Sequence, residues 1–180
     1  TTTLNFTAAD VVAPILSSTS PTDNATGVAA GANIVLTFNE NVAAGSGNIT
    51  LKKSSDNSTV QAMAVGGANV SISGAVVTIN PTANLASSQG YYVQVDATAI
   101  DDASGNSFAG ISDTTTLSFT AADSAGPAIA SSSPADNATG VAVDANIVLT
   151  FDENVGVGSG NITLKKSSDN STVQAMPVGG

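Results

Sequence analysis

The sequence repeats itself at an offset of 113 residues, and this repeat limits what the chain can fold into. Residues 1–67 align with residues 114–180, and 52 of these 67 positions are identical. Within this match the sixteen residues from Asn48 to Met63 return unchanged from Asn161 to Met176, lysines and serines included. Because a fold needs only its apolar pattern to be kept, identity at polar positions indicates a recent or homogenised duplication. We therefore expect successive copies of one domain of ordinary size.

The repeat also sets the expected domain boundaries. Residues 1–13 are interpreted as the last strand, over 1–9, and the linker of a preceding repeat, and residues 14–122 as one complete repeat. Residues 123–126 are interpreted as a linker and residues 127–180 as the N-terminal part of the next repeat. This last part could bury too little surface to be stable alone. The register predicts a window from a longer tandem array.

Apolar and polar side chains alternate along short segments of the complete repeat. In the segment ANIVLTF, Ile34, Leu36 and Phe38 fall on one face and Asn33, Val35 and Thr37 on the other. The same period of two recurs in the segments NITLKK, NVSISGAVVTIN, YYVQV and TLSFT, separated by polar turns, whereas helical periodicity is weak. The pattern predicts an all-β fold, an antiparallel sandwich of about seven strands per repeat.

Five motifs of the complete repeat occur in a fixed order. They are SPTDNATGV from Ser20, ANIVLTFNENV from Ala32, Asn80 and Pro81 followed by Leu85 and Tyr91, DDASGN from Asp101, and a closing TTTLSFT. Together they resemble the bacterial Ig-like domains of the S-layer type, which occur in tandem in large cell-surface proteins. The resemblance implies an Ig-like β-sandwich without the Cys and Trp signature of antibody domains. It also implies a spacer or extender role in an adhesin, S-layer or surface filament.

Composition excludes several classes of function. The chain has 4 Lys and no Arg against 14 Asp and Glu, for a net charge of −10, so it has no cationic stripe for nucleic acid. It has no Cys and no His, so thiol and imidazole chemistry are absent. No apolar run approaches the roughly 20 residues that span a bilayer, and no signal peptide opens the sequence. Acidity with abundant Thr, Ser, Asn, Gly and Ala predicts an extracellular or cell-surface protein without membrane insertion.

Carboxylates are the remaining candidates for a binding site. Ig-type topology would bring Asp10 in the N-terminal linker, Glu40 after the second strand, and Asp101, Asp102 and Asn106 of the DDASGN loop to one pole of the sandwich. One repeat later, Asp123, Asp152 and Glu153 repeat this arrangement. Carboxylates crowded without nearby Lys repel one another, and calcium, with six to eight oxygen ligands, would resolve this repulsion. Solvated turn carboxylates are the alternative, because Asp and Asn commonly cap turns.

Four apolar or aromatic residues are expected to be structural: Leu85, Tyr91, Phe38 and Phe119. Tyr91 lies where an Ig-type tyrosine corner would fall, at the start of the penultimate strand. Plain core packing is the alternative role for this side chain. Neither role involves catalytic chemistry.

Three functions remain to be compared. The first is a non-catalytic extender module whose partners are neighbouring copies of the same repeat. The second is a self-assembling subunit of a filament or S-layer, joined by head-to-tail docking or strand exchange. The third is a carbohydrate-binding module, for which Tyr92 is the candidate exposed aromatic residue on a strand. A glycosidase with paired carboxylates is disfavoured, since aromatic residues make up only 4% of the chain.

Overall fold

The structure is a computed structural model that describes residues 3–179. It divides into two compact units, a first unit of Thr1–Ser124 and a second unit of Ala125–Gly180. The boundary lies inside the segment 123–126 that the repeat indicates as a linker. All regular elements of the described residues are β-strands, so the all-β prediction is confirmed.

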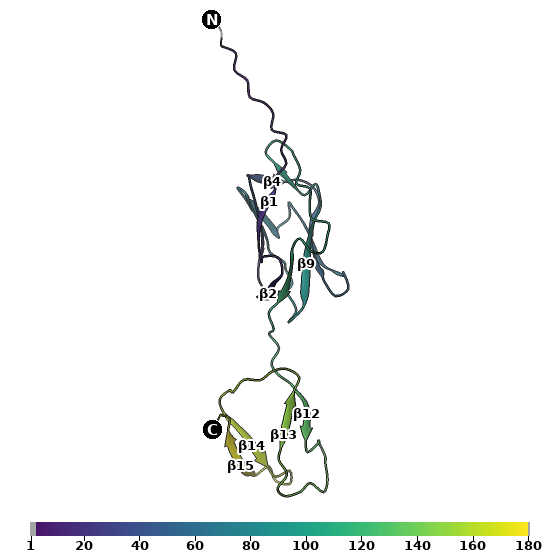
Figure 1. The fold of residues 1–180 in the computed structure, drawn as a ribbon, viewed down its shortest axis with the longest axis vertical. Coiled ribbons are helices and arrows are strands. Elements are labelled where there is room, and N and C mark those ends of the chain that lie inside the picture. The colour runs from purple at the N-terminus through teal and green to yellow at the C-terminus, as the bar shows by residue number, and fades with distance from the viewer. Residues whose placement is uncertain (1–2, 180) are drawn as a thin grey trace. The chain divides into compact units, whose positions relative to one another are not determined.

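The first unit is a sandwich of two main sheets (Figure 1). One sheet has the strand order β1-β3-β8-β7 and the other the order β2-β11-β9-β5-β6, while β4 and β10 pair with each other. The pairs are antiparallel except β2 with β11, which is parallel. The strands are β1 Leu16–Ser20, β2 Ala25–Val28, β3 Ile34–Phe38, β4 Val42–Ala44, β5 Asn48–Lys53, β6 Thr59–Ala64, β7 Val70–Ser73, β8 Val76–Ile79, β9 Gly90–Val95, β10 Ile100–Asp102 and β11 Ser118–Ala121.

These strands are shorter and more numerous than the seven or so expected. The N-terminal strand is split, because β1 pairs with β3 in one sheet and β2 pairs with β11 in the other. Pro21 lies in the break and has no N–H group to donate to a ladder, so a continuous strand cannot pass through it. The split places the first segment of the domain on both sheets.

The hydrophobic core lies between the two main sheets. Ile34, Leu36 and Phe38 of β3 are 2%, 0% and 3% exposed, as the alternation predicts. They belong to one cluster with Ile49 and Leu51 of β5 and with buried residues of β8, β9 and β11. The first unit therefore closes its own interior.

Tyr91 makes the contact that defines a tyrosine corner. Its ring is 2% exposed and lies 5.8 Å from the ring of Phe119, centroid to centroid. Its hydroxyl oxygen accepts a hydrogen bond of 2.8 Å from the backbone N–H of Ala86, five residues upstream. The adjacent Leu85 is buried at 7% exposure. The loop before β9 is thus tied both to the core and to the strand that follows it.

The second unit contains two antiparallel pairs. β12 (Ile129–Ser133) pairs with β13 (Val148–Phe151), and β14 (Asn161–Lys165) pairs with β15 (Thr172–Pro177). Their registers repeat those of β1 with β3 and of β5 with β6, including the position of each bulge. The second unit therefore reproduces the local pairings of residues 14–67, with many apolar side chains exposed.

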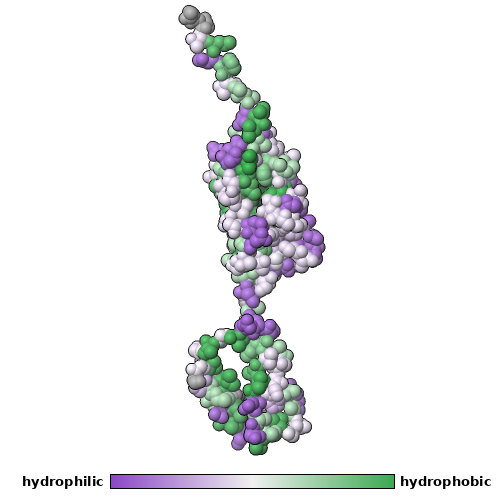
Figure 2. Space-filling model, in the orientation of Figure 1, coloured by the Kyte–Doolittle hydropathy of each residue, from purple (hydrophilic) through white to green (hydrophobic). Residues whose placement is uncertain are grey.

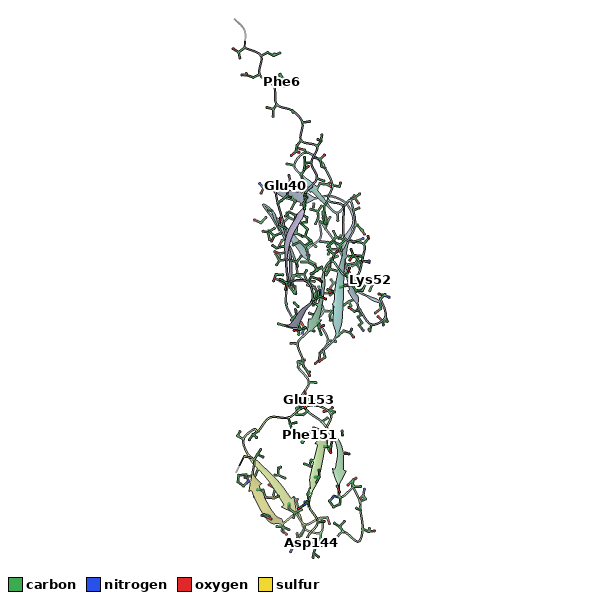
Figure 3. All side chains as sticks on the ribbon, viewed as in Figure 1. Phe6, Glu40, Lys52, Asp144, Phe151 and Glu153 are labelled. Atoms are coloured by element: carbon green, nitrogen blue, oxygen red, sulfur yellow. The ribbon has the colours of Figure 1, made fainter. Side chains whose placement is uncertain are left out.

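Residues 3–13 precede the sandwich and form no strand. Leu4 and Phe6 are 84% and 88% exposed, and Phe6 projects from this segment (Figure 3). Their repeat counterparts, Leu117 and Phe119, are 1% and 3% exposed because β11 lies between β2 and β9. The sequence predicted that residues 1–9 form the last strand of a preceding repeat. In the structure residues 3–9 have no neighbouring strands like β2 and β9 and form no strand. Residues 1 and 2 lie outside the described range.

Candidate functional site

Three carboxyl groups meet at the pole of the first unit where the N-terminal segment joins it, the N-terminal pole. Glu40 follows β3, Asp102 ends β10, and Asp10 belongs to the N-terminal segment. One carboxylate oxygen from each lies within 4.8 Å of the other two. Figure 3 shows Glu40 at this end of the sandwich. The cluster joins segments that are about 30 to 90 residues apart in the sequence.

Asp102 is the anchor of this cluster. It is 5% exposed and is the one buried polar or charged residue in the part of the chain that the structure describes. Its Oδ1 accepts 2.8 Å hydrogen bonds from the N–H groups of Ser104 and Asn106, and its Oδ2 accepts one of 2.7 Å from Asn106 Nδ2. These bonds, the one from the Asn106 side chain foremost, lower the pKa of Asp102 despite its burial. The group is therefore held as a carboxylate.

The loop that carries these residues is fastened to the core and to the N-terminal segment. Phe108 packs edge-on against Phe38, with ring centroids 5.1 Å apart. Asn106 Nδ2 also lies 3.2 Å from the carbonyl oxygen of Asp10 and 3.4 Å from that of Val12, to both of which it donates. Asn106 thus links the buried carboxylate of Asp102 to the incoming chain.

The pKa of Glu40 is shifted in the opposite direction from that of Asp102. Desolvation raises its pKa, and the negative charges of Asp10 and Asp102 raise it further. The lysines of the first unit, Lys52 and Lys53, lie on β5 and leave this pole without a compensating cation. The repulsion can be relieved by a proton on Glu40 or by a bound cation.

The donor set fits a hard cation. All three side chains offer carboxylate oxygens, which are the ligands that calcium prefers, and calcium takes further oxygens from backbone carbonyls and water. Neither nitrogen nor sulfur ligands occur in the cluster, which disfavours zinc and other transition metals. Asp10, Glu40 and Asp102 could therefore hold calcium.

Asp101 does not join this cluster. Successive side chains of a strand point to opposite faces, so Asp101 and Asp102 of β10 diverge. Asp101 Oδ1 instead accepts a 2.6 Å hydrogen bond from the Ser107 hydroxyl. The structure therefore places Asp101 outside the group of Asp10, Glu40 and Asp102.

The three acidic residues that were expected to form an equivalent cluster one repeat later are divided between the two units. Asp123 belongs to the first unit, where its Oδ1 accepts a 2.8 Å hydrogen bond from the Ser87 hydroxyl. Asp152 belongs to the second unit, where its Oδ1 accepts a 2.8 Å bond from the N–H of Ala128. Glu153 follows it and is exposed (Figure 3). A second calcium site formed by these three residues stays a prediction.

Other aspartates serve as hydrogen-bond acceptors in turns. Asp23 Oδ1 accepts 2.9 Å bonds from the N–H and the hydroxyl of Ser118, and these bonds lower its pKa. Asp113 accepts bonds from Thr115 and Thr116, the hydroxyl of Thr116 foremost, which lower its pKa to about 2. Sequence reasoning missed the role of Asp113, although the run DTTT is a signal for this kind of turn.

Tyr92 is not the exposed aromatic residue that a carbohydrate site would need. Its side chain is 2% exposed. The Lys52 ammonium lies 5.8 Å from the ring centroid, and the hydroxyl donates a 3.1 Å hydrogen bond to Asn57 Oδ1. Alternation predicted correctly that Tyr92 faces away from Tyr91, but the β5–β6 hairpin covers it.

Two depressions of the first unit give no support for hydrolase chemistry. A hollow of about 310 Å³ is lined by Asn24, Ser54, Tyr91, Phe119 and neighbouring residues, without a carboxylate. Another, of about 230 Å³, includes one carboxylate, Asp96, in its lining. A glycosidase needs two carboxyl groups across one site. Neither depression supplies such a pair.

The sequence profile of the bacterial Ig-like domain matches residues 10–121 and again residues 123–178. The chain belongs to the bacterial Ig-like domain family. The identification agrees with the sandwich of the first unit and with the resemblance noted in its motifs. The two successive matches follow the two units of the structure.

Solved structures give distant likenesses to this bacterial Ig-like chain. CopC from Methylosinus trichosporium OB3b is 18% identical with a TM-score of 0.45, over 63% of this chain and 97% of CopC. The S-layer protein rSbsC(31-844) is 15% identical with a TM-score of 0.40, over 89% of this chain and 22% of that one. The N-terminal part of the S-layer protein SbsC is 14% identical with a TM-score of 0.40, over 93% and 44%. A search of curated proteins found no match.

Residues 3–179 include no helix with the length and apolarity needed to cross a membrane.

Proposed function

We propose that this chain is a non-catalytic extender of a large secreted or cell-surface bacterial protein, similar to an adhesin. One observation carries the proposal: in the first unit the chain joins the sandwich at one pole and leaves it at the opposite pole (Figure 1). A domain with this path adds its own length each time it is repeated. The repeat of 113 residues supplies such copies, and membership of the bacterial Ig-like family supports the bacterial setting.

The polar groups of the first unit also favour a structural role. Asp23, Asp56, Asp102 and Asp113 accept hydrogen bonds from nearby backbone or hydroxyl groups, and in each case these bonds lower the pKa. Such carboxylates stabilise turns as anions and are poor general acids at neutral pH. We therefore propose that these carboxylates contribute to the stability of the domain.

The extender role is tested with arrays of increasing length. Chains with one, two and three inserted copies of residues 14–126 would be compared by small-angle X-ray scattering. We expect the maximum dimension to grow by a constant increment for each copy. Arrays that fold back, so that the maximum dimension stops growing, would contradict the proposal.

The proposal includes calcium at the N-terminal pole. Calcium between Asp10, Glu40 and Asp102 would tie the N-terminal segment to the sandwich and stiffen the junction between repeats. The crowding of the three carboxyl groups and the raised pKa of Glu40 support it. Asn106 already holds the same segment through the Asp10 and Val12 carbonyls, so the cation would reinforce an existing contact.

Thermal melting of the full chain with calcium or with a chelator tests this part. We expect calcium at about millimolar concentration, the range of extracellular modules, to raise the midpoint. Glu40→Gln should abolish the gain of the first unit, whereas Glu153→Gln, the same change in the second unit, should keep the gain of the first unit. An equal midpoint with calcium and chelator would rule out the calcium site and leave the extender role intact.

A further inference from the structure

The first unit closes its own core, but its two main sheets end in edge strands. These are β1 and β7 in one sheet and β2 and β6 in the other. An edge strand presents backbone N–H and C=O groups with which a further strand can pair. Polar and neutral residues cover most of the face of the first unit that Figure 2 shows, so that face offers no broad apolar patch to a partner. The edges are therefore the surfaces to compare.

Three of the four edges carry features that hinder pairing with another strand. β1 is bulged between Leu16 and Ser18. β2 has four residues and includes Gly27, whose φ of 70° departs from the extended conformation. β7 has four residues, and β4 contacts the turn after it, because the Val42 N–H donates to the Gly74 carbonyl. Short and bulged edge strands prevent edge-to-edge association in native sheets.

β6 lacks these protections. It has six residues, and Thr59–Ala64 contains neither a charged residue nor a proline. Its ladder with β5 is regular from Gln61 to Ala64, and the register shift of this ladder precedes Gln61. The loop after β8 contacts β6 through the side chain of Gln61, whose Oε1 accepts hydrogen bonds from the N–H and the hydroxyl of Thr82. This contact does not use the backbone edge of β6.

The backbone groups of Ala62 point away from β5. The Val65 N–H donates to the Gly47 carbonyl, so Asn48 and Ala64 form a non-hydrogen-bonded pair, and by alternation Ala62 belongs to another such pair. Residues of these pairs direct their N–H and C=O groups to the other side of their own strand. On β6 that side has no neighbouring strand in the described part of the chain. The N–H and C=O of Ala62 and the N–H of Ala64 therefore face the open edge.

The second unit carries one change at this edge. Residues 48–67 and 161–180 differ at a single position, where Pro177 replaces Ala64. β15 nevertheless keeps the register of β6. Proline has no N–H group and is one of the residues that block an edge strand. The change keeps the hairpin and removes an outward donor, so the edge is open in the first unit and blocked in the second.

We propose that β6 of the first unit pairs with β6 of a second copy of this chain. The two strands run antiparallel about a twofold axis at Ala62, whose N–H and C=O groups bond with those of Ala62 in the other copy. The Ala64 N–H then meets the Val60 carbonyl of the other strand. Such an interface is isologous, since each edge supplies both donors and acceptors. It joins the two five-stranded sheets edge to edge.

Charge and side-chain size favour a second copy at this edge. The chain has a net charge of −10, so most approaches between copies bring like charges together. Residues 59–65 carry no charge, and the exposed side chains beside the new ladder, Ala62 and Ala64, are small. A pair of six-residue strands buries much less than the roughly 1,600 Å² of a standard interface, so one pair is weak. Several such pairs along two arrays would strengthen one another.

The pairing goes beyond the extender role, because it would join neighbouring arrays side by side. It does not change the length that each repeat adds. A chain that stays monomeric would still give the scattering increments expected of the extender, so the two proposals can fail separately.

Disulfide trapping tests the pairing, because the chain has no cysteine of its own. In the proposed register the two Ala62 residues form a hydrogen-bonded pair with Cα atoms about 5.5 Å apart, a separation that a disulfide can bridge. The full chain with Ala62→Cys would be equilibrated at high protein concentration in a thiol–disulfide buffer. We expect linked dimers in several-fold excess over those of Ser71→Cys, which places the thiol at an exposed position of the edge strand β7.

Ala64→Pro, combined with Ala62→Cys, gives the first unit the residue found in the second and should reduce the linked dimer to the level of Ser71→Cys. Ala64→Ser, the matched control, keeps the N–H group and should leave the dimer unchanged. Urea unfolding followed by tyrosine fluorescence verifies that the first unit of each variant is folded, since both tyrosines lie there. Should Ala64→Pro unfold it, the comparison of Ala62→Cys with Ser71→Cys decides alone.

Equal yields of linked dimer from Ala62→Cys and Ser71→Cys would overturn the proposal. An edge that accepts only strands of other proteins would give this result. Persistence of the linked dimer in a folded Ala64→Pro variant would overturn the proposal as well, because the outward N–H group would then have no part in the association.

Discussion

The two units of this chain carry nearly the same residues and differ in what those residues bury. Leu36 and Ile49 are fully buried in the first unit, whereas their counterparts Leu149 and Ile162 are partly buried and 51% exposed. The strands that contain them pair in the same register in both units. Matching sequence and matching strand pairs therefore do not suffice for a core. The second layer, made by residues 68–122, is what closes it.

Short-range features are shared by the two units. Asn24 and Asn137 have φ angles of 58° and 59°, and Asn57 and Asn170 have 57° and 59°. Asn accepts this left-handed conformation more readily than most residues. Asp56 and Asp169 both accept hydrogen bonds from the serine two residues on, Ser58 and Ser171, which lower their pKa. Turns thus follow the local sequence, and burial follows the tertiary neighbours.

Truncation of a core leucine should give the largest difference between the units. Leu36→Ala removes a fully buried side chain and is expected to cost about 2–5 kcal/mol of unfolding free energy. Leu149→Ala should leave the stability of the first unit unchanged. Both tyrosines lie in the first unit, so urea unfolding followed by tyrosine fluorescence reports on that unit. Equal losses in the two variants would contradict the difference in burial.

The tyrosine corner belongs to residues 68–122 of the first unit. Tyr91→Phe removes the hydrogen bond to Ala86 and should cost about 1 kcal/mol of unfolding free energy. Tyr92→Phe, which removes a longer bond to the exposed Asn57, is the matched control and should cost less. Urea unfolding monitored by the remaining tyrosine measures both. A larger loss of unfolding free energy for Tyr92→Phe than for Tyr91→Phe would show that the tyrosine corner is not the stronger of the two hydrogen bonds.

Nearby negative charges distinguish Glu40 from its repeat counterpart Glu153. Because the pKa of Glu40 is raised above its ordinary 4.5, the folded state holds this proton more tightly, and stability falls as pH rises through the raised pKa. Without calcium, Glu40→Gln should therefore raise the urea midpoint of the first unit at pH 7, by less than the Tyr91→Phe effect. Below pH 4.5 the rise of the urea midpoint caused by Glu40→Gln should vanish.

Glu153→Gln makes the same change of net charge in the second unit and should not move the midpoint of the first. A rise of the same size with Glu153→Gln would show that overall charge, and not the cluster of Asp10, Glu40 and Asp102, is responsible.

The smallest expected effect concerns Asp23 and its counterpart Asp136. Hydrogen bonds from Ser118 lower the pKa of Asp23 below its ordinary 3.8, so its stabilising effect is full above that pH and is lost as pH falls through the lowered value. Asp23→Asn should flatten the acid side of the stability profile of the first unit. Asp136→Asn should not, because Ser118 belongs to the first unit. Urea midpoints between pH 2 and 5 provide the test.

The N-terminal pole was predicted in part from sequence. Ig-type topology brought Asp10, Glu40, Asp102 and Asn106 together correctly. Asp101 lies outside this group, since the orientation of two adjacent aspartates depends on where β10 begins and on its pairing with β4. Tyr92 was misplaced for a similar reason: alternation gives the face of a strand, and a neighbouring hairpin decides whether that face is covered.

The sequence by itself determined the repeat, the all-β class and the turns, because these depend on side chains within a few residues of one another. The tertiary structure decided which repeated side chains are buried and which carboxylates meet. Burial and charge proximity depend on segments far apart in the chain, as where residues 68–122 of the first unit lie over residues 14–67.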